Sequence, residues 1–517
     1  MTEAGVAMGN TSVAVLQLKA GDEVGVALRD LAPGEAMTPF DIATSEKIPF
    51  GHKVCLTELA PGATIHRLGQ PIGIATTMIA AGVHVHLHNM GFETTMAGHG
   101  IGTRLANTPM RPAPEIPTFD GYLRADGRVG TRNFIGVLTT VNCSAMVARM
   151  IADQFRDPAR LAPWPGVDGV VALTHKSGCS VAEGSRSMAM LRRTLGGYAR
   201  HPNFCGILFV GLGCEDNQID MLLDEQGLAE GPMLRKLVIQ EIGGTRASIR
   251  RGVEMVEEML AEATRCRRQP IPAGELVVGL QCGGSDSFSG ISANPALGAA
   301  VDRLVACNGT AILAETPEIY GAENLLLERA ASREIGERLI GLLDWWADYT
   351  KNEPQGFDNN PSPGNKEGGL TTILEKSLGA VAKGGTTNLN GVIGYGVPVE
   401  ARGLVFMDSP GFDPMSATGQ VASGANLIAF TTGRGSCFGC RPSPSLKLAT
   451  NSAMFARMEE DMDLNCGVIL DGDSSIDEMG ELIFREFLAV ASGKPTRSEL
   501  LGYGEDEFAP WHVNAWL

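Results

Sequence analysis

The stretch Leu280–Pro295 reads LQCGGSDSFSGISANP and follows directly on the apolar run Leu276–Leu280. It contains one cysteine, three glycines, four serines and one aspartate. Glycines let backbone N–H groups approach a ligand closely, and short polar side chains supply donors and acceptors without bulk. We therefore predict a buried strand whose end forms part of an active-site floor.

The same pattern, an apolar run that ends in small polar residues, recurs four times. The strings are VLTTVNCS (137–144), LTHKSGCS (173–180), FVGLGCEDNQ (209–218) and AFTTGRGS (429–436). A further strand is expected at Leu237–Gln240, and helices at Ala145–Arg156, Ala182–Tyr198, Thr245–Arg268, Pro295–Ala306, Ala322–Tyr349 and Ser475–Ser492. This alternation predicts an α/β fold with parallel-rich sheets, helices on their faces and several strand ends at one pocket.

The N-terminal part of the chain has a different pattern. From about Val13 to Asn89 short apolar stretches alternate with turn signals, which predicts a small all-β domain over residues 10–92. Residues 93–118 carry four prolines and no clear period, and we expect a linker there. Because 517 residues exceed one hydrophobic core, we expect two more domains: an α/β domain at 119–270 and a catalytic α/β domain at 271–517.

The composition is that of an ordinary globular protein. Apolar residues make up 44%, mean hydropathy is +0.03 and the net charge is −17, which disfavours nucleic acid and anionic membranes as partners. We see no apolar run of the roughly 18–20 residues that a membrane span needs and no signal peptide, so a cytoplasmic location is expected. The 11 cysteines are an odd, dispersed set and are expected to be reduced thiols. The oligomeric state is left open, and a homo-oligomer is compatible with the sequence.

Three histidines stand close together in VHVHLHN (83–89). If this segment is a strand, His84, His86 and His88 face one side and can present imidazole nitrogens to one cation. A lone histidine is usually a surface or core residue, but three of the nine histidines within five positions favour a metal site.

Four cysteines each close an expected strand: Cys143, Cys179, Cys214 and Cys282. One interpretation is a shared thiolate site for iron or another soft metal, with Cys143, Cys179 and Cys282 as ligands. The other is that each is a small buried hydrophobe. The spacing does not decide, because none of the four belongs to paired CxxC motifs; the single CxxC, at Cys437 and Cys440, has no partner pair.

Candidate catalytic groups follow buried runs or stand beside glycines. Asp286 and Glu315, in an acidic group with Glu318 and Glu323, are candidates for general acid/base catalysis or metal binding, and His175 and Lys366 are candidate bases. For an anionic substrate the expected clamps are Arg132 and Arg434, with neighbouring polar side chains from Asn133, Ser285 and Asn365. Each of these charges could instead be an ordinary surface charge beside a turn.

Taken together, these strings resemble the altronate/galactarate dehydratases, bacterial lyases of sugar-acid catabolism. The resemblance rests on GHKVCLTELAPGATIHRLGQPIG, HVHLHN, DGRVGTRN, THKSGCS, GLGCEDNQ, QCGGSDSFSGISANPALG, AETPEIYGAE, NPSPGNKEGG, EKSLG and TTGRGS, in the family's order over nearly the whole chain. It implies that the N-terminal all-β domain is similar to a SAF, or β-clip, domain.

The resemblance also implies a reaction. Family members remove water from a hexonate or hexarate with divalent iron, or manganese, giving a 2-keto-3-deoxy acid, and the histidine triplet resembles the altronate-type branch. A cation is needed because a C–H beside a carboxylate is a weak acid and hydroxide a poor leaving group. Three alternatives remain: an iron–sulfur hydro-lyase, a sulfo-lyase acting on sulfolactate, and an inactive sugar-acid binding protein.

Overall fold

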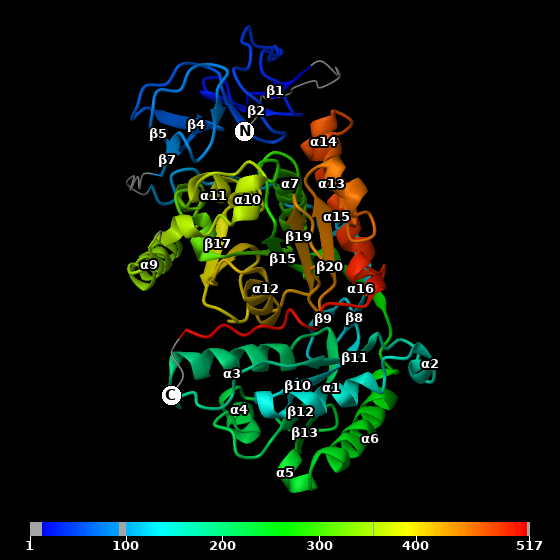
Figure 1. The fold of residues 1–517 in the computed structure, drawn as a ribbon. Helices are drawn as coiled ribbons and strands as arrows, with labels where there is room; N and C mark the ends of the chain where they lie inside the picture. The colour runs from blue at the N-terminus through cyan, green and yellow to red at the C-terminus, as the bar shows by residue number, and fades with distance from the viewer. Residues whose placement is uncertain (1–12, 93–99, 355, 514–517) are drawn as a thin grey trace.

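The computed structural model describes residues 13–92, 100–354 and 356–513. Three bodies lie in a row (Figure 1): a small strand-rich module at the N-terminus, a central body around a seven-stranded sheet, and a body around a four-stranded sheet at the other end. Residues 10–12 of the expected all-β domain, 93–99 of the expected linker and 514–517 lie outside the described residues.

The N-terminal module consists of short antiparallel strands, as expected for a small all-β domain. One sheet has the order β1-β2-β3-β6 (Val15–Leu16, Val24–Ala27, Lys53–Cys55, His84–Val85) and the other β4-β5-β7 (Thr64–Arg67, Gln70–Ala75, Met90–Gly91). Similar tight turns at Gly34, Gly62 and Gly82 separate the strands, each with φ between 80° and 85°. Glycine adopts this left-handed conformation without steric cost, so the recurring turn keeps the strands short.

The four-stranded sheet is entirely parallel, in the order β11-β10-β12-β13 (Gly169–Leu173, Phe134–Thr139, Phe204–Gly211, Leu234–Val238). Alternate residues of β10 face different cores: Ile135 and Val137 pack with α1 and α6, whereas Phe134 and Leu138 pack with α3. This follows from the two-residue period of a strand. The helices of this body are α1 (Ala145–Asp153), α2 (Pro158–Leu161), α3 (Arg186–Ala199), α4 (Ile219–Glu225), α5 (Ile239–Ile242) and α6 (Thr245–Ala263).

The seven-stranded sheet is also parallel, and its strand order places a ligand site. The order is β17-β18-β16-β15-β19-β20-β21 (Leu389–Ile393, Gly403–Met407, Thr310–Ala314, Val277–Cys282, Leu427–Thr432, Ser445–Ala449, Leu464–Asn465). The strands β16, β17 and β18 lie on one side of β15, and the chain then returns to place β19 on the other side. In such sheets ligands bind outside the carboxyl ends of the strands at this switch point.

Helices cover both faces of this sheet. α7 (Ala293–Ala306) and α15 (Ile476–Ala491) lie against one face, and α12 (Asp413–Ala422) lies between the other face and α3. The remaining helices of the central body are α8 (Asn324–Leu327), α9 (Arg333–Tyr349), α10 (Pro363–Glu367), α11 (Ile373–Ala382), α13 (Ser452–Arg457), α14 (Val468–Asp471) and α16 (Arg497–Leu501). The sequence-based expectation of an α/β body with parallel-rich sheets is therefore confirmed.

Two expected elements differ in their bounds. The helix expected at Ala322–Tyr349 is two helices, α8 and α9, because Ala331 donates its N–H to Leu389 and Ser332 caps α9 at Ile335. The strand expected at Leu237–Gln240 ends at Val238, where α5 begins.

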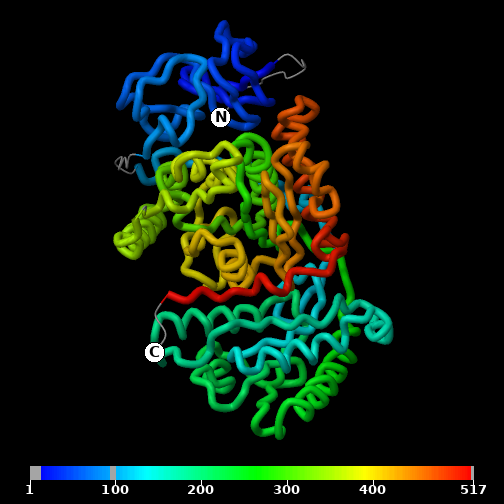
Figure 2. Tube along the Cα trace, viewed as in Figure 1, coloured from blue at the N-terminus to red at the C-terminus, as the bar shows by residue number. Residues whose placement is uncertain are grey.

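The C-terminal segment joins the two α/β bodies. Figure 2 shows it running between them toward the end of α3. The N–H of Ala509 donates to Thr418 Oγ1 at 3.0 Å, and the N–H of Val513 donates to Ser187 Oγ at 3.2 Å. A three-stranded sheet, β14-β8-β9 (Gln269–Pro272, Thr118–Leu123, Val129–Gly130), also links these bodies. Within the described ranges, none of the helices combines the length and apolar character needed to traverse a membrane.

Candidate functional site

The N-terminal module covers the carboxyl edge of the seven-stranded sheet. Phe50 of the module packs on Phe288 of the loop after β15, with ring centroids 4.5 Å apart. A cavity lies between the two bodies and is lined by Arg67 from the module, by Cys282 and Ser285 after β15, and by Lys376 from α11. The hydroxyls of Ser285 and Ser287 are buried there without a hydrogen-bond partner within the described structure. Unpaired donors in a cavity at the switch point are suited to a polar ligand.

A buried ionic cluster fastens the module to this edge. Lys53 Nζ lies 2.8 Å from Glu375 Oε2, and Arg67 also pairs with Glu375. Burial opposes ionisation of the Glu375 carboxyl, but Lys53 and Arg67 outweigh it and lower its pKa to about 2. Because the side chains of Lys53 and Glu375 are fully buried, removing one partner would leave an unpaired buried charge.

The expected histidine strand is shorter than predicted. β6 contains only His84 and Val85, and the chain turns from His86 to Asn89, with the N–H of Asn89 donating to the His86 carbonyl at 3.0 Å. The expected alternation therefore fails beyond Val85, because the turn ends the period of two. Leu87, which strict alternation would place with Val85 on the face opposite the histidines, is 44% exposed, whereas Val85 is buried.

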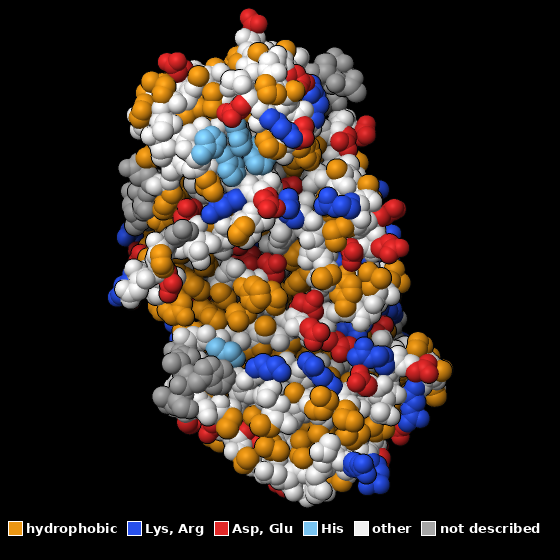
Figure 3. Space-filling model, in the orientation of Figure 1, with side chains coloured by type: hydrophobic (Ala, Val, Ile, Leu, Met, Phe, Trp, Pro, Cys, Tyr) orange, Lys and Arg blue, Asp and Glu red, His pale blue; other side chains and the backbone are white. Residues whose placement is uncertain are grey.

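An imidazole cluster forms nevertheless, with His52 as an additional member. The ring of His52 lies 5.0 Å from His84 and 5.1 Å from His86, centroid to centroid, and His88 lies 5.5 Å from His84 on the exposed side. Figure 3 shows these side chains as one patch on the module, directly above a row of basic and acidic side chains. Acidic side chains also lie in the hollow below that row.

The hydrogen bonds of this imidazole cluster define its protonation. His52 Nε2 lies 3.1 Å from the Glu367 carbonyl and His86 Nε2 lies 3.0 Å from the Lys366 carbonyl, so both nitrogens carry hydrogen. Burial lowers the pKa of His84 to about 3 and of His86 to about 4, so these two imidazoles are neutral near pH 7. Neutral imidazole is the form that binds a metal.

Two nitrogens of the imidazole cluster fit adjacent positions around a divalent cation. His52 Nδ1 and His84 Nε2 approach to 2.9 Å. With metal–nitrogen bonds of about 2.1 Å, neighbouring ligands of an octahedral ion lie about 3 Å apart. A cation here would have two imidazole ligands from this chain.

A second group of ionisable side chains is buried beneath the edge. Glu315, directly after β16, is fully buried with φ of 74°, and neither carboxylate oxygen has a hydrogen-bond partner in the part of the chain that the structure describes. Lys383 Nζ lies 3.8 Å away. Burial, and then the neighbouring Glu318, raise the pKa of Glu315 well above its usual value, which favours the protonated form of this carboxyl.

The neighbours of Glu315 have different charge states. Burial disfavours the Glu318 carboxylate, but Lys376, 2.8 Å away, and Lys383 outweigh it and lower the pKa of Glu318. Burial, and then Glu318, raise the pKa of Asp413 to about 7. Asp413 is partly exposed, so this group reaches solvent beside α12. Carboxyls whose pKa values are separated in this way are typical of acid–base sites.

Cys282, Glu315 and Glu318 bring possible ligand atoms within 4.8 Å of one another. However, Lys383 Nζ already lies 3.0 Å from Cys282 Sγ, and Lys376 pairs with Glu318. Burial raises the pKa of the Cys282 thiol to about 11, which favours the neutral thiol here. Because two ammonium groups occupy this site, a divalent cation fits the imidazole cluster better, and the expectation of Cys282 as a metal ligand is not supported.

Other expected site residues lie at the same edge with different roles. Arg434 pairs with Glu367 at 2.9 Å, and the Arg434 side chain remains 44% exposed. Lys366 precedes Glu367 on α10 and is half-buried. Asp286 accepts hydrogen bonds from Ser289, Thr450 and Asn451 and holds its loop, so its oxygens are occupied. Asn365 likewise bonds the Ser285 carbonyl and caps α10.

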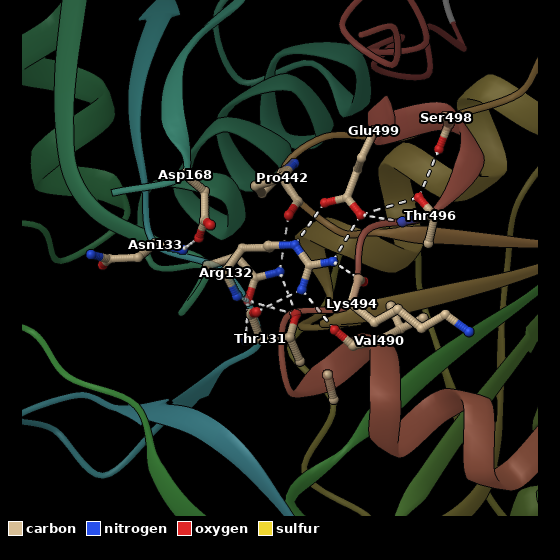
Figure 4. Close-up of polar contacts among 12 residues, drawn as sticks. Thr131, Arg132, Asn133, Asp168, Pro442, Val490, Lys494, Thr496, Ser498 and Glu499 are labelled. Atoms are coloured by element: carbon tan, nitrogen blue, oxygen red, sulfur yellow. Dashed lines mark hydrogen bonds and ion pairs between the residues drawn. The ribbon is translucent and has the colours of Figure 1, made fainter. Parts of the chain in front are cut away.

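Arg132 and Asn133 are structural, contrary to the expectation that they bind substrate. Figure 4 shows the Arg132 guanidinium directed at Glu499 and at the carbonyls of Val490 and Lys494. The Asn133 amide donates to the carbonyls of Gly166 and Ala263. The Arg132 bonds join the two α/β bodies and leave Arg132 3% exposed, so its donors are not available to a substrate.

His175 and the expected cysteine set also differ from the prediction. His175 Nε2 bonds the Thr139 carbonyl and its Nδ1 accepts the N–H of Ser177, so neither nitrogen is free to move a proton. Cys143 and Cys179 are exposed on the four-stranded sheet, whereas Cys282 is buried in the seven-stranded sheet. These three thiols therefore do not form one site, because they lie on different sheets.

Several members of the site were not predicted from the sequence. His52, Glu375, Lys376, Lys383 and Asp413 come from segments distant from the strands they meet. One signal was available: Lys376 and Lys383 are seven residues apart in EKSLGAVAK and share a helix face.

Three family models match the chain in succession. They are the altronate/galactarate dehydratase SAF domain at residues 13–93, the D-galactarate dehydratase/altronate hydrolase second domain at 121–264, and the D-galactarate/altronate dehydratase C-terminal domain at 273–515.

Curated relatives match along nearly their whole length. The chain is 34% identical to the altronate dehydratase of Bacillus subtilis (strain 168) over 486 residues, 92% of this chain and 95% of that protein. It is 34% identical to the altronate dehydratase of Escherichia coli (strain K12) over 487 residues, which is 94% of this chain and 96% of that protein. It is 37% identical to the L-threo-forming galactarate dehydratase of Escherichia coli (strain K12) over 464 residues, 88% of each.

Proposed function

The chain belongs to the altronate and galactarate dehydratase family and is a carbon–oxygen lyase; from that premise we propose that it dehydrates an aldonate or aldarate such as D-altronate or D-galactarate with the help of a divalent metal. The product is a 2-keto-3-deoxy acid plus water. The observation that carries the proposal is the buried Glu315 carboxyl at the carboxyl end of a central strand, at a strained φ and without a hydrogen-bond partner among the described residues. A cytoplasmic location is part of the same proposal.

Glu315 acts as the general acid in this mechanism. Loss of the C3 hydroxyl requires a proton, since hydroxide leaves poorly. A carboxyl whose pKa burial raises can supply that proton, and Lys383 at 3.8 Å stabilises the carboxylate that remains.

Asp413 is the candidate base. Its pKa of about 7 lies near the operating pH, where a base is both substantially ionised and strong enough to take the C2 proton. Glu318 is held ionised by Lys376, which makes it less basic. The enol that results from proton removal and water loss tautomerises to the ketone.

His52 and His84 would hold the metal, with Fe²⁺ as the first candidate among the ions that imidazole and oxygen ligands accept and Mn²⁺ as the second. When bound, the metal supplies a Lewis acid that neutralises developing negative charge on the substrate carboxylate. Arg434 and Lys366 at the rim provide the remaining positive charge for that carboxylate.

The experiment is a substrate panel with anaerobically purified protein and ferrous iron, with 2-keto acid formation as the readout. D-altronate, D-galactarate, their stereoisomers and sulfolactate are compared. A keto acid from one sugar acid supports the proposal and identifies the substrate. Sulfite release from sulfolactate, or no product from any sugar acid with iron bound, would contradict it.

Metal binding is tested separately with His84→Ala and with His66→Ala as a matched control. His66 lies on β4 of the same module and pairs with Glu23, away from the imidazole cluster. We expect His84→Ala to lose iron on dialysis and His66→Ala to retain it. Equal iron content in the two variants would rule out the imidazole site.

A further inference from the structure

The carboxyl edge of the four-stranded sheet carries three exposed cysteines on three adjacent strands. Cys179 follows β11, Cys143 follows β10 and Cys214 follows β12, and these strands are neighbours in the order β11-β10-β12. Only one other cysteine of the described residues, Cys437, is exposed. The mechanism proposed above uses none of the three.

Hydrogen bonds hold the three cysteine loops together. The N–H of Asn142 donates to the Ser177 carbonyl at 2.9 Å, and the N–H of Asn217 donates to the Gly178 carbonyl at 3.0 Å. The Asn217 amide also reaches the Thr140 carbonyl at 3.0 Å. Each cysteine is thus within three residues of a hydrogen bond to a neighbouring loop, so the three cysteine loops are held side by side at this edge.

A close backbone approach brings Cys179 next to the Cys143 loop. A Cβ on Gly178 would lie 2.1 Å from the Thr140 carbonyl oxygen, so only glycine permits this contact. His175 supports the same loop from below by accepting the N–H of Ser177. The Ser177 hydroxyl is buried and has no hydrogen-bond partner in the described structure, which leaves an unused polar group in this loop.

We propose that Cys143, Cys179 and Cys214 hold an iron–sulfur cluster of the four-iron type. Thiolates are the protein ligands of such clusters, and each thiol that binds releases its proton. Three cysteines leave one iron of the cluster without a protein ligand. The positive charge of exposed Lys176, on the Cys179 loop, offsets part of the negative charge of the loaded site.

The arrangement of the three sulfur atoms does not fit a single ion. The three do not all lie within 4.8 Å of one another, unlike the ligand atoms of Cys282, Glu315 and Glu318. In a mononuclear zinc site with bonds of about 2.3 Å, neighbouring sulfurs lie about 3.8 Å apart. The sulfur atoms that bind the different iron atoms of a polynuclear cluster lie farther apart than those around a single ion.

The test is anaerobic reconstitution of the whole chain with ferrous iron, sulfide and a thiol reductant, followed by desalting. We expect a broad visible absorption band and about four iron and four acid-labile sulfide ions per chain. Cys143→Ser, Cys179→Ser and Cys214→Ser should each lose most of the band, whereas Cys437→Ser, the matched exposed cysteine, should keep it. A band that persists in the three variants, or bound zinc without sulfide, overturns the proposal.

A second measurement uses the unmodified chain, so its result does not depend on whether a variant folds. After reconstitution, iodoacetamide should label Cys437 but not Cys143, Cys179 or Cys214, as read by peptide mass spectrometry. Equal labelling of all four before and after reconstitution would contradict the cluster. Neither readout uses turnover, and His84→Ala should keep the band, so the cluster and the proposed dehydration can fail independently.

Discussion

The carboxyl edges of the two parallel sheets differ in what they bury. At the four-stranded edge the cysteines are exposed, and the buried polar groups His175, Glu215 and Asn217 are hydrogen-bonded to neighbouring loops. At the seven-stranded edge the N-terminal module covers the loops, and Glu315 is buried without a hydrogen-bond partner in the described residues. Burial is the largest cause that raises the pKa of Glu315, so covering this edge favours the protonated form of its carboxyl.

The largest effect is expected at the covered edge, from Glu315→Gln. The amide has the same shape but cannot donate a carboxylic proton, and removing a general acid costs about 10²–10⁴-fold in rate. We expect kcat for keto acid formation to fall about 10³-fold with KM little changed. Glu337→Gln, an exposed glutamate of α9, is the control and should keep wild-type kinetics. A kcat within threefold of wild type for Glu315→Gln would remove Glu315 from the mechanism.

Glu375→Gln tests whether the module is held on by the buried ionic cluster. The change leaves Lys53 and Arg67 without their buried counter-charge, which costs about 3 kcal/mol or more in the free energy of unfolding. Thermal unfolding should show a lower Tm. Glu337→Gln breaks only an exposed pair with Arg333 and should change stability by about 0.5 kcal/mol or less. An equal decrease in Tm for the two variants would show that the buried ionic cluster does not hold the module.

The pH dependence of stability tests the buried histidine of the four-stranded edge. Burial lowers the pKa of His175 from 6.5 to about 4 in the folded chain. Between these values the unfolded chain binds more protons, so the free energy of unfolding falls as the pH drops from 6.5 toward 4. The loss from His175 is about 2–3 kcal/mol by pH 4.5. Urea unfolding at several pH values should show a flatter profile for His175→Asn; an unchanged profile would contradict the assignment.

The smallest effect is expected from Arg434→Gln at the rim. An exposed arginine that attracts the substrate carboxylate contributes mainly to binding, so KM should rise about tenfold with kcat nearly unchanged. Arg402→Gln is the matched control, because Arg402 is 43% exposed and pairs with Glu275 elsewhere on the surface. If the two variants show the same KM, Arg434 does not contact the substrate.

Much of the fold follows from local patterns. The apolar run Leu276–Leu280 lies largely in β15, where the sequence predicts a strand, and the alternation with helices predicts parallel sheets. The small all-β module follows from repeated glycine turns, which need only a few residues to form. Glu315 was found for the same reason, since it directly follows a buried strand.

The errors concern residues whose partners are distant in the sequence. Arg132 beside glycine and threonine suggests a substrate clamp, but its partner Glu499 is 367 positions away. His52 joins His84 across 32 positions and lies outside the VHVHLHN motif. No local pattern contains such a pairing, so neither could be assigned from the sequence.

The sequence by itself determined the fold class, the strand ends that carry polar residues and the family of this chain, because backbone preferences and short motifs are set within a few residues. Only the tertiary structure decided which charges are paired, which carboxyls are desolvated and which cysteines share an edge. The reason is physical: pKa shifts and ligand sets depend on burial and on contacts between segments hundreds of residues apart. Glu315, Lys383 and Asp413 become one acid–base group only when the sheet, α11 and α12 pack together.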